Sequence, residues 1–236
     1  MLAELMPASA AVVEVHGDIA DAPLYPEEKE VIERAVEKRR REFRTGRACA
    51  RAALAKLGVE ARAIPSGPKG APQWPAGIAG SITHCDGYRA CAVAHQADLV
   101  SIGIDAEPDA PLPEGLLADI ALPEERRALE ALAREEPALS WDRLLFSAKE
   151  AVYKAWFPLA GRWLGFEDAR LELDRERRTF SARLLVRGPR LGDLELDGFR
   201  GRWLARDGLL LTAIAVAAGE DRPEGEVGVD AGAGEE

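Results

Sequence analysis

Two stretches of this chain repeat the same order of predicted elements, a helical region followed by several short strands. In each stretch a Pro-Glu-Glu triplet, at 26–28 and at 123–125, begins a helix, because proline suits the first helical turn and carboxylates complement the helix dipole. The later segments are short, apolar and separated by turn residues, which predicts antiparallel strands. This order favours an α+β fold with two similar lobes.

Capping and turn residues set the expected bounds of these elements. The first helix is predicted from Pro26 to a stop at Gly58, with Gly46 as a candidate kink, and Ser140 caps a later helix. Residues 61–79 are rich in proline and glycine and are interpreted as a loop. Strands are predicted at 11–15, 81–84, 90–94, 99–104, 169–173, 180–186, 201–205 and 209–215.

A proline-rich interruption at 108–113 is the best candidate for a linker between the lobes. We therefore expect an N-terminal lobe at 1–108 and a C-terminal lobe at 109–218. Residues 219–236 are acidic and have almost nothing apolar to bury, which is typical of a disordered tail.

The charge and the termini limit the partners of the chain. A formal net charge of -10 argues against a general nucleic-acid binder, because proteins that neutralise phosphates usually carry a basic excess. Cys49, Cys85 and Cys91 show no metal-ligand spacing, as expected of reduced thiols. The N-terminus lacks the basic start of a secretory signal, and no apolar run approaches the ~20 residues of a membrane helix. We expect a soluble, cytoplasmic protein.

Two acidic residues follow an apolar segment at 103–107 (GIDAE). Alternation along a strand places Asp105 and Glu107 on one side and turns Ala106 away. Two carboxylates placed in this way can bind one hard cation. The same spacing also occurs at solvated strand ends, so the pair alone leaves both interpretations open.

A second group of residues lies on a predicted helix. Phe146, Glu150 and Lys154 recur every four residues and therefore share one face. A glutamate four residues before a lysine is normally a surface ion pair. Here the face also carries an aromatic residue, while a separate stripe of alanines and leucines already supplies the core positions. The pair is therefore a candidate for chemistry as well as for a surface contact.

Candidate phosphate-binding residues lie in the first half of the chain. The segment 69–75 (KGAPQWP) offers backbone N–H groups and one lysine to a phosphate. His84 ends the next strand and is either structural or functional. One helix face is either a solvated basic face or an anion-binding surface, and its cations are Lys38, Arg39, Arg40, Arg41, Arg44, Arg47 and Arg51.

Four ordered blocks, found between residues 26 and 215, together resemble one family. They are KRRREFRTGRACARAAL, GPKGAPQWPAGIAGSITHC, SIGIDAEP and LFSAKEAVYKAWFP. The chain resembles the Sfp-type 4′-phosphopantetheinyl transferases, in particular the branch related to the enterobactin-synthase component and its actinobacterial relatives. Members are pseudo-dimers of two α+β lobes with coenzyme A and Mg²⁺ in the cleft between them, and the resemblance implies that fold here.

The resemblance also implies an activity. Such enzymes transfer 4′-phosphopantetheine from coenzyme A to a serine of an apo carrier protein and release 3′,5′-ADP. It implies a cytoplasmic monomer that uses Mg²⁺, with Mn²⁺ as a possible substitute because an all-oxygen site accepts both. The sequence leaves open whether the carriers belong to fatty-acid, polyketide or nonribosomal-peptide synthesis.

The matching positions imply a set of site residues. The expected metal ligands are Asp105, Glu107 and Glu150. The residues expected at coenzyme A are Arg39, Arg47, Lys69, Gly70, Pro72, Thr83, His84, Asp105, Lys149 and Lys154, with Arg40 or Arg51 as substitutes on the first helix. A groove for the pantetheine arm is expected at Phe146, Tyr153 and Trp163. Buried aromatics are ordinarily core residues, so the groove stays one of two interpretations.

Two catalytic roles follow from the same resemblance. Glu150 would bind the metal and take the proton of the attacking serine, while Lys154 would neutralise the departing phosphate. Two other functions use the same residues. A hydrolase of coenzyme A or a nucleotide would replace the serine with water, and a binding module would hold coenzyme A, or nucleic acid through the arginine helix, without catalysis.

Overall fold

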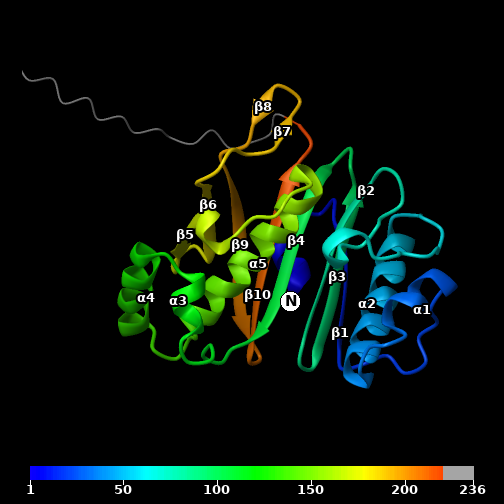
Figure 1. Ribbon diagram of the computed structural model, residues 1–236, viewed down its shortest axis with the longest axis horizontal. Helices are drawn as coiled ribbons and strands as arrows, with labels where there is room; N and C mark the ends of the chain where they lie inside the picture. The colour runs from blue at the N-terminus through cyan, green and yellow to red at the C-terminus, as the bar shows by residue number, and fades with distance from the viewer. Residues whose placement is uncertain (220–236) are drawn as a thin grey trace, which may run out of the picture.

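A computed structural model describes residues 1–219 as a mixed α/β protein with antiparallel sheets. The chain folds into two groups of strands, each covered by a long helix on its outer side (Figure 1). The tail expected to be disordered lies, apart from Gly219, outside the described residues. Within residues 1–219, no helix combines the length and the apolar character needed to cross a membrane.

The first group is a three-stranded sheet with the order β1-β3-β2. Its strands are β1 (Ala11–His16), β2 (Ile78–Cys85) and β3 (Tyr88–His95). A tight turn at Asp86 and Gly87 joins β2 to β3, as the sequence predicted. Helix α2 (Glu37–Lys56) packs on this sheet through small residues such as Ala50 and Ala53, which meet Cys91 and Val93 of β3.

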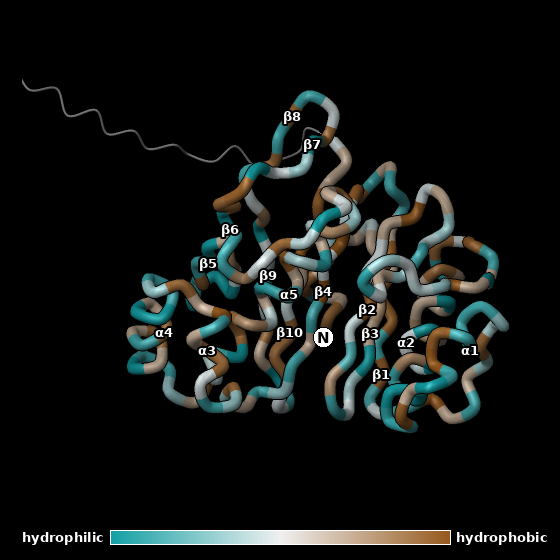
Figure 2. Tube along the Cα trace, viewed as in Figure 1, coloured by the Kyte–Doolittle hydropathy of each residue, from teal (hydrophilic) through white to brown (hydrophobic). Residues whose placement is uncertain are grey.

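The second group is a five-stranded antiparallel sheet with the order β4-β10-β9-β6-β5. Its strands are β4 (Leu99–Pro108), β5 (Ala169–Asp174), β6 (Thr179–Leu184), β9 (Gly198–Arg206) and β10 (Leu209–Ala217). Helix α5 (Trp141–Ala160) covers one face and buries Trp156 in the core. The amphipathic helix α4 (Pro123–Glu135) packs beside α5 and is largely hydrophilic on its outer side (Figure 2).

The remaining elements are short. They are the 3₁₀ helices η1 (Leu2–Leu5), η2 (Pro68–Gly70) and η3 (Phe166–Asp168), the helices α1 (Pro26–Ile32) and α3 (Leu116–Ile120), and the strands β7 (Arg190–Leu191) and β8 (Leu194–Glu195). Each of the eight segments predicted as strands overlaps a strand of the structure. The three cysteines are buried free thiols, in agreement with the sequence expectation.

The prediction of one continuous helix from Pro26 to Gly58 is wrong. The structure breaks it after Ile32 and restarts it at Glu37, whereas Gly46 lies inside the regular α2. The break allows the buried carboxylate of Glu28 to pair with Arg51 at 2.9 Å and to accept the Ile64 N–H. A long-range ion pair therefore overrides the helical pattern.

Strand β4 is the element that joins the two groups. Its even-numbered residues Ile102, Ile104 and Ala106 fill a central core between the sheets, together with η1, β3 and β10. Its odd-numbered residues face α5, since the Ser101 hydroxyl donates to Ala155 O at 2.7 Å and Asp105 pairs with Lys154. The alternation expected of the GIDAE segment is confirmed, and both acidic residues lie on the α5 side.

Side-chain hydroxyls connect β4 to β2, because the two strands share no backbone ladder. The Ile104 N–H donates to Ser81 Oγ at 3.2 Å, and the Ala106 N–H donates to Thr83 Oγ1 at 3.0 Å. Although β4 was assigned to the first lobe, its backbone pairs with β10 of the second sheet. The boundary after residue 108 stays a prediction.

Helix α5 approaches β4 closely at Gly103. A Cβ built on this residue would lie 2.0 Å from Ala151 O and 2.8 Å from Ala155 N, which are backbone atoms of α5. Gly103→Ala should therefore push strand and helix apart and lower the free energy of unfolding by about 3 kcal/mol. Urea denaturation would measure the change. Gly46→Ala is the control, because its methyl group would meet only the movable Ile82 side chain; equal stability of both variants would contradict the prediction.

Candidate active site

The odd-numbered side of β4 meets α5 at an ion pair. Lys154 Nζ lies 2.6 Å from Asp105 Oδ1 and 3.1 Å from Ile104 O, to which it donates. Asp105 is buried, and its other oxygen, Oδ2, is buried without a hydrogen-bond partner in the described structure. A buried carboxylate oxygen without a donor is costly, so this atom is available for a ligand.

Glu107 lies two residues further along the strand and is held by Arg143. The Arg143 guanidinium donates to Glu107 Oε2 at 2.9 Å, to Pro111 O at 2.9 Å and to Ala110 O at 3.1 Å. It thus fixes the acidic strand end and the segment after it to the start of α5. Sequence reasoning missed Arg143, although it precedes Glu150 by two helical turns and so falls on the same face of α5.

Glu150 is half-buried on α5 and completes the acidic cluster. Burial raises the pKa of its carboxyl, and Asp105 raises it further, while Lys154 lowers it. Burial also raises the pKa of Glu107, again with a contribution from the negative charge of Asp105. The negative charge of Asp105 therefore repels both glutamates, and an added cation would stabilise the carboxylates in the ionised form.

The chemistry of these donors fits a divalent cation. The cluster supplies carboxylate oxygens, the ligands that Mg²⁺ and Mn²⁺ prefer, and Asp105 Oδ2 has no hydrogen-bond partner among residues 1–219. In the described structure Lys154 and Arg143 hold two of the three acids. No three acidic, histidine or cysteine side chains within residues 1–219 are arranged as a ready-made metal site, so metal binding by this cluster stays a prediction.

A second part of the site lies where α2 meets the end of β2. Arg39 Nη1 lies 2.6 Å from His84 Nε2, so two residues expected at coenzyme A are in contact. Burial, together with the positive charges of Arg39, Lys154 and Arg89, lowers the pKa of His84 to about 4. His84 is therefore neutral at pH 7, and Lys154 links this cationic region to the acidic cluster.

The depressed pKa of His84 predicts a pH dependence of folding. The unfolded chain protonates this residue below its usual pKa of ~6.5, whereas the folded chain does so only near 4. Since the unfolded state then binds more protons, stability should fall as the pH is lowered from ~6.5 toward 4. Urea midpoints at pH 7 and pH 5 should differ less for His84→Gln than for wild type. The exposed His95→Gln is the control, and an unchanged difference in His84→Gln would contradict the assignment.

Three of the residues expected at coenzyme A make contacts within the fold. The buried Arg47 donates to Ile64 O at 2.7 Å and to Ser66 Oγ at 3.1 Å, which fixes the loop before η2. The hydroxyl of Thr83 accepts the Ala106 N–H and lies 3.3 Å from Asp105 Oδ1, to which it donates. Lys149 is buried against Glu125 at 3.0 Å and donates to two backbone carbonyls. Contact of these three residues with coenzyme A stays a prediction.

The two arginines named as substitutes for Arg47 also make contacts within the fold. Arg51 pairs with the buried Glu28 and donates to Pro23 O. Arg40 donates to Glu33 O at 2.5 Å at the break between α1 and α2. Among the cations proposed for the first helix, Arg39 is thus the one in contact with His84.

Two of the three aromatic residues expected to form a groove, Tyr153 and Trp163, line one cavity. Glu150, Tyr153, Trp163 and Phe166 line a cavity of about 110 Å³ beside α5. The rings of Tyr153 and Trp163 are 4.9 Å apart, and Trp163 is 62% exposed. Phe146 packs 6.1 Å from Phe166 but does not line the cavity. Sequence reasoning missed Phe166, which follows a glycine at the start of the short helix η3 and carries no periodic signal.

One residue of the glycine-rich loop lies near an aromatic residue of this cavity. Lys69 Nζ lies 5.8 Å from the centroid of the Trp163 ring, although the two residues are far apart in sequence. Gly70 N–H donates to Gly67 O at 3.1 Å, and Pro72 faces Ser66 in an isolated β-bridge. The loop therefore brings the exposed Lys69 close to Trp163, which lines the cavity beside Glu150.

Family models match both halves of the chain. The model described as "4'-phosphopantetheinyl transferase N-terminal domain" matches residues 27–94. The model described as "4'-phosphopantetheinyl transferase superfamily" matches residues 101–202. The two matches together contain the acidic cluster, Arg39, His84 and the aromatic cavity.

Individual proteins are similar over most of the chain. The 4'-phosphopantetheinyl transferase Svp of Streptomyces mobaraensis is 53% identical over 92% of this chain and 90% of its own length. Npt of Nocardia iowensis is 50% identical over 92% of this chain and its full length, and PptT of Mycobacterium tuberculosis is 46% identical over 92% of this chain and 98% of its own length. Enterobactin synthase component D of Salmonella typhi is 38% identical over half of each chain.

Proposed function

Because this chain belongs to the 4′-phosphopantetheinyl transferase superfamily, we propose that it transfers 4′-phosphopantetheine from coenzyme A to a serine of apo carrier proteins and releases 3′,5′-ADP. The transfer of phosphopantetheine to carrier proteins is supported by the similar transferases. We also propose a cytoplasmic monomer with two similar lobes at 1–108 and 109–218. The carriers would be those of fatty-acid, polyketide or nonribosomal-peptide synthesis.

One structural observation supports the reaction most directly. Strand β4 and helix α5 bring Asp105, Glu107, Glu150 and Lys154 to one place, with the unpartnered Asp105 Oδ2 among them. A phosphoryl transfer needs positive charge near the non-bridging and leaving oxygens and a base for the nucleophile. The cluster contains both kinds of group.

The chain's own residues would perform two steps. Glu150 would take the proton of the carrier serine, directly or through water, because an ordinary serine hydroxyl does not ionise at pH 7. Lys154 would leave Asp105 in part and stabilise the charge that develops as the pyrophosphate bond breaks. The raised pKa of Glu150 suits a base, since it makes the carboxylate a stronger proton acceptor.

A divalent cation, Mg²⁺ in our proposal with Mn²⁺ as a substitute, would be held by Asp105, Glu107 and Glu150 and would supply electrostatic stabilisation of phosphate oxygens. Arg143 would keep Glu107 in position, and Lys154 would shift from Asp105 toward the phosphates. Tyr153 and Trp163 would contact the pantetheine arm in the cavity beside Glu150.

The test is an intact-mass measurement of apo carrier proteins. Each carrier is incubated with this chain, coenzyme A and Mg²⁺, and the expected result is a gain of one phosphopantetheine arm. Carriers from each of the three pathways would define the range of partners. If coenzyme A were consumed without any gain of mass, a pyrophosphate hydrolase would replace this proposal; binding without consumption would favour a binding module.

Arg39 provides a test of how the donor binds. Its side chain is exposed and its hydrogen bond to His84 leaves further N–H groups for an anion. Arg39→Ala should raise KM for coenzyme A about tenfold through the loss of a charge-assisted contact, and should raise KM for 3′-dephospho-coenzyme A much less. The exposed Arg127→Ala on α4 is the control. Equal damage with both donors would remove Arg39 from the 3′-phosphate.

A further inference from the structure

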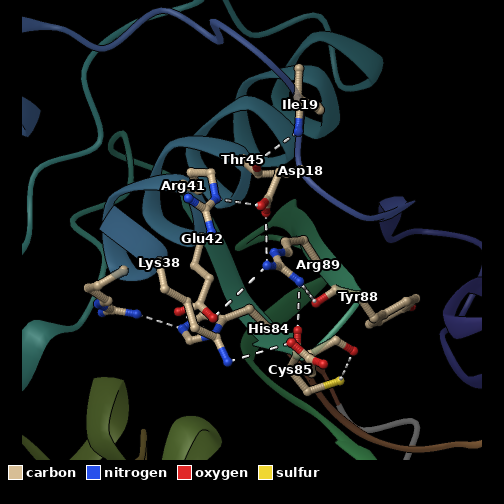
Figure 3. A network of polar contacts seen from close by, with 12 residues as sticks. Asp18, Ile19, Lys38, Arg41, Glu42, Thr45, His84, Cys85, Tyr88 and Arg89 are labelled. Atoms are coloured by element: carbon tan, nitrogen blue, oxygen red, sulfur yellow. Dashed lines mark hydrogen bonds and ion pairs between the residues drawn. The ribbon is translucent and has the colours of Figure 1, made fainter. Parts of the chain in front are cut away.

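A chain of alternating charges lies beside the cationic end of the site (Figure 3). It begins at Asp18, in the segment after β1, where Asp18 Oδ1 lies 2.8 Å from Arg89 Nη2. Arg89 Nη2 lies 4.0 Å from Glu42 Oε1, and Glu42 Oε2 lies 3.6 Å from His84 Nδ1. His84 then contacts Arg39 through its other ring nitrogen. The sequence motifs singled out neither Glu42 nor Arg89.

Arg89 is the buried residue that holds this row of charged side chains in place. It is buried on β3 and donates to Cys85 O at 2.6 Å and to Tyr88 O at 3.2 Å, the two residues that flank the β2–β3 turn. The same guanidinium therefore holds the hairpin that carries His84 and positions Glu42 from α2. A buried carboxylate between such partners has little freedom to move.

The contacts define the protonation of the His84 ring. Arginine nitrogens only donate hydrogen bonds, so Nε2 accepts from Arg39 and carries no proton in this arrangement. The ring is neutral near pH 7, which places its proton on Nδ1. Among the described residues, Glu42 is the acid within 4 Å of that nitrogen. The other charged groups that influence the ring are Arg39 on α2, Arg89 on β3, Asp105 on β4 and Lys154 on α5.

We propose that Glu42 is a positioning residue: its carboxylate holds His84 in the form protonated on Nδ1, so that Nε2 fixes Arg39 toward a bound phosphate. This inference rests on the proposed function, because the anion would be a phosphate of the donor. It assigns Glu42 no contact with the donor itself. Without the carboxylate, the ring would adopt the form protonated on Nε2, which repels the Arg39 guanidinium.

Two measurements without turnover test the inference. Two-bond ¹H–¹⁵N spectra report which ring nitrogen of His84 is protonated, and the chain has only two other histidines, His16 and His95. Calorimetry reports the Kd of 3′,5′-ADP. In Glu42→Gln, signals of the form protonated on Nε2 should appear for His84 alone, and Kd should rise about tenfold, the effect expected when the partner that orients a binding group is lost.

The control is Asp18→Asn, which also removes an acidic partner of Arg89 but has no contact with His84. It should leave the His84 signals and Kd unchanged. The inference is overturned if Glu42→Gln leaves the ring unchanged, if the ring changes without any effect on Kd, or if both variants weaken binding equally. If Glu42→Gln does not fold, Glu42→Asp, whose shorter side chain withdraws the charge from the ring, takes its place. A wild-type chain that binds no 3′,5′-ADP would instead contradict the proposed function.

Discussion

Replacing Glu150 with glutamine should reduce transfer by a factor of about 10²–10⁴, the usual contribution of a general base. The substitution keeps the shape of the side chain but removes its ability to accept a proton. It should leave the fold intact, because Glu150 makes no ion pair within residues 1–219 and burial already disfavours its charge. The rate should be measured in a single turnover with an apo carrier, so that release of the product does not mask the chemical step.

The control for this variant is Glu130→Gln, an exposed glutamate of α4. Thermal unfolding should show both proteins folded, and only Glu150→Gln should lose transfer. The binding of Mn²⁺ separates the two roles proposed for Glu150: a loss of rate with unchanged metal affinity assigns it as a base alone. Transfer within tenfold of wild type would remove it from both roles.

Replacing Asp105 with asparagine should reduce transfer by about 10²-fold or more, as expected when one preorganised electrostatic group is lost. The amide keeps an oxygen for Thr83 and Lys154, so the hydrogen-bond geometry is largely preserved. The charge that attracts the cation is lost, and Lys154 no longer has an ion-pair partner. Mn²⁺ affinity should fall together with the rate.

Asp98→Asn is the matched control, because Asp98 is exposed just before β4, at the opposite end of this strand from Asp105 and Glu107. It should keep both the rate and the affinity of the wild type. If Asp105→Asn transferred the arm at nearly the wild-type rate with saturating Mg²⁺, the assignment of the metal site to this cluster would be wrong.

Local patterns were sufficient to predict most secondary structure. Alternation identified β4 and placed Asp105 and Glu107 on one side, and turn residues identified the hairpin at Asp86. The break between α1 and α2 was missed, because it depends on the contact of Glu28 with Arg51, which are distant in sequence. Local helix propensity cannot predict a contact between residues that are distant in sequence.

The sequence predicted which types of residue the candidate site contains, but it was a weaker guide to which of these side chains are buried in the fold. A lysine or arginine in a family motif looks the same whether it faces a ligand or the core. Lys149 adjoins Glu150 in sequence, yet one residue rotates a helix by about 100°, and its ammonium is buried against Glu125. Arg143 was missed for the opposite reason, since a single arginine at the start of a helix is common on protein surfaces.

The pairing of β4 with β10 has a consequence for how the protein can be recombined. Asp105, Glu107, Glu150 and Lys154 all belong to the segment after residue 98, whereas Arg39, Glu42 and His84 all belong to the segment before it. A chimaera of two relatives joined in the turn between β3 and β4 would inherit the groups proposed to react from one parent and the groups proposed to bind the donor phosphate from the other. A junction after residue 108 would instead separate the acidic strand from its own helix.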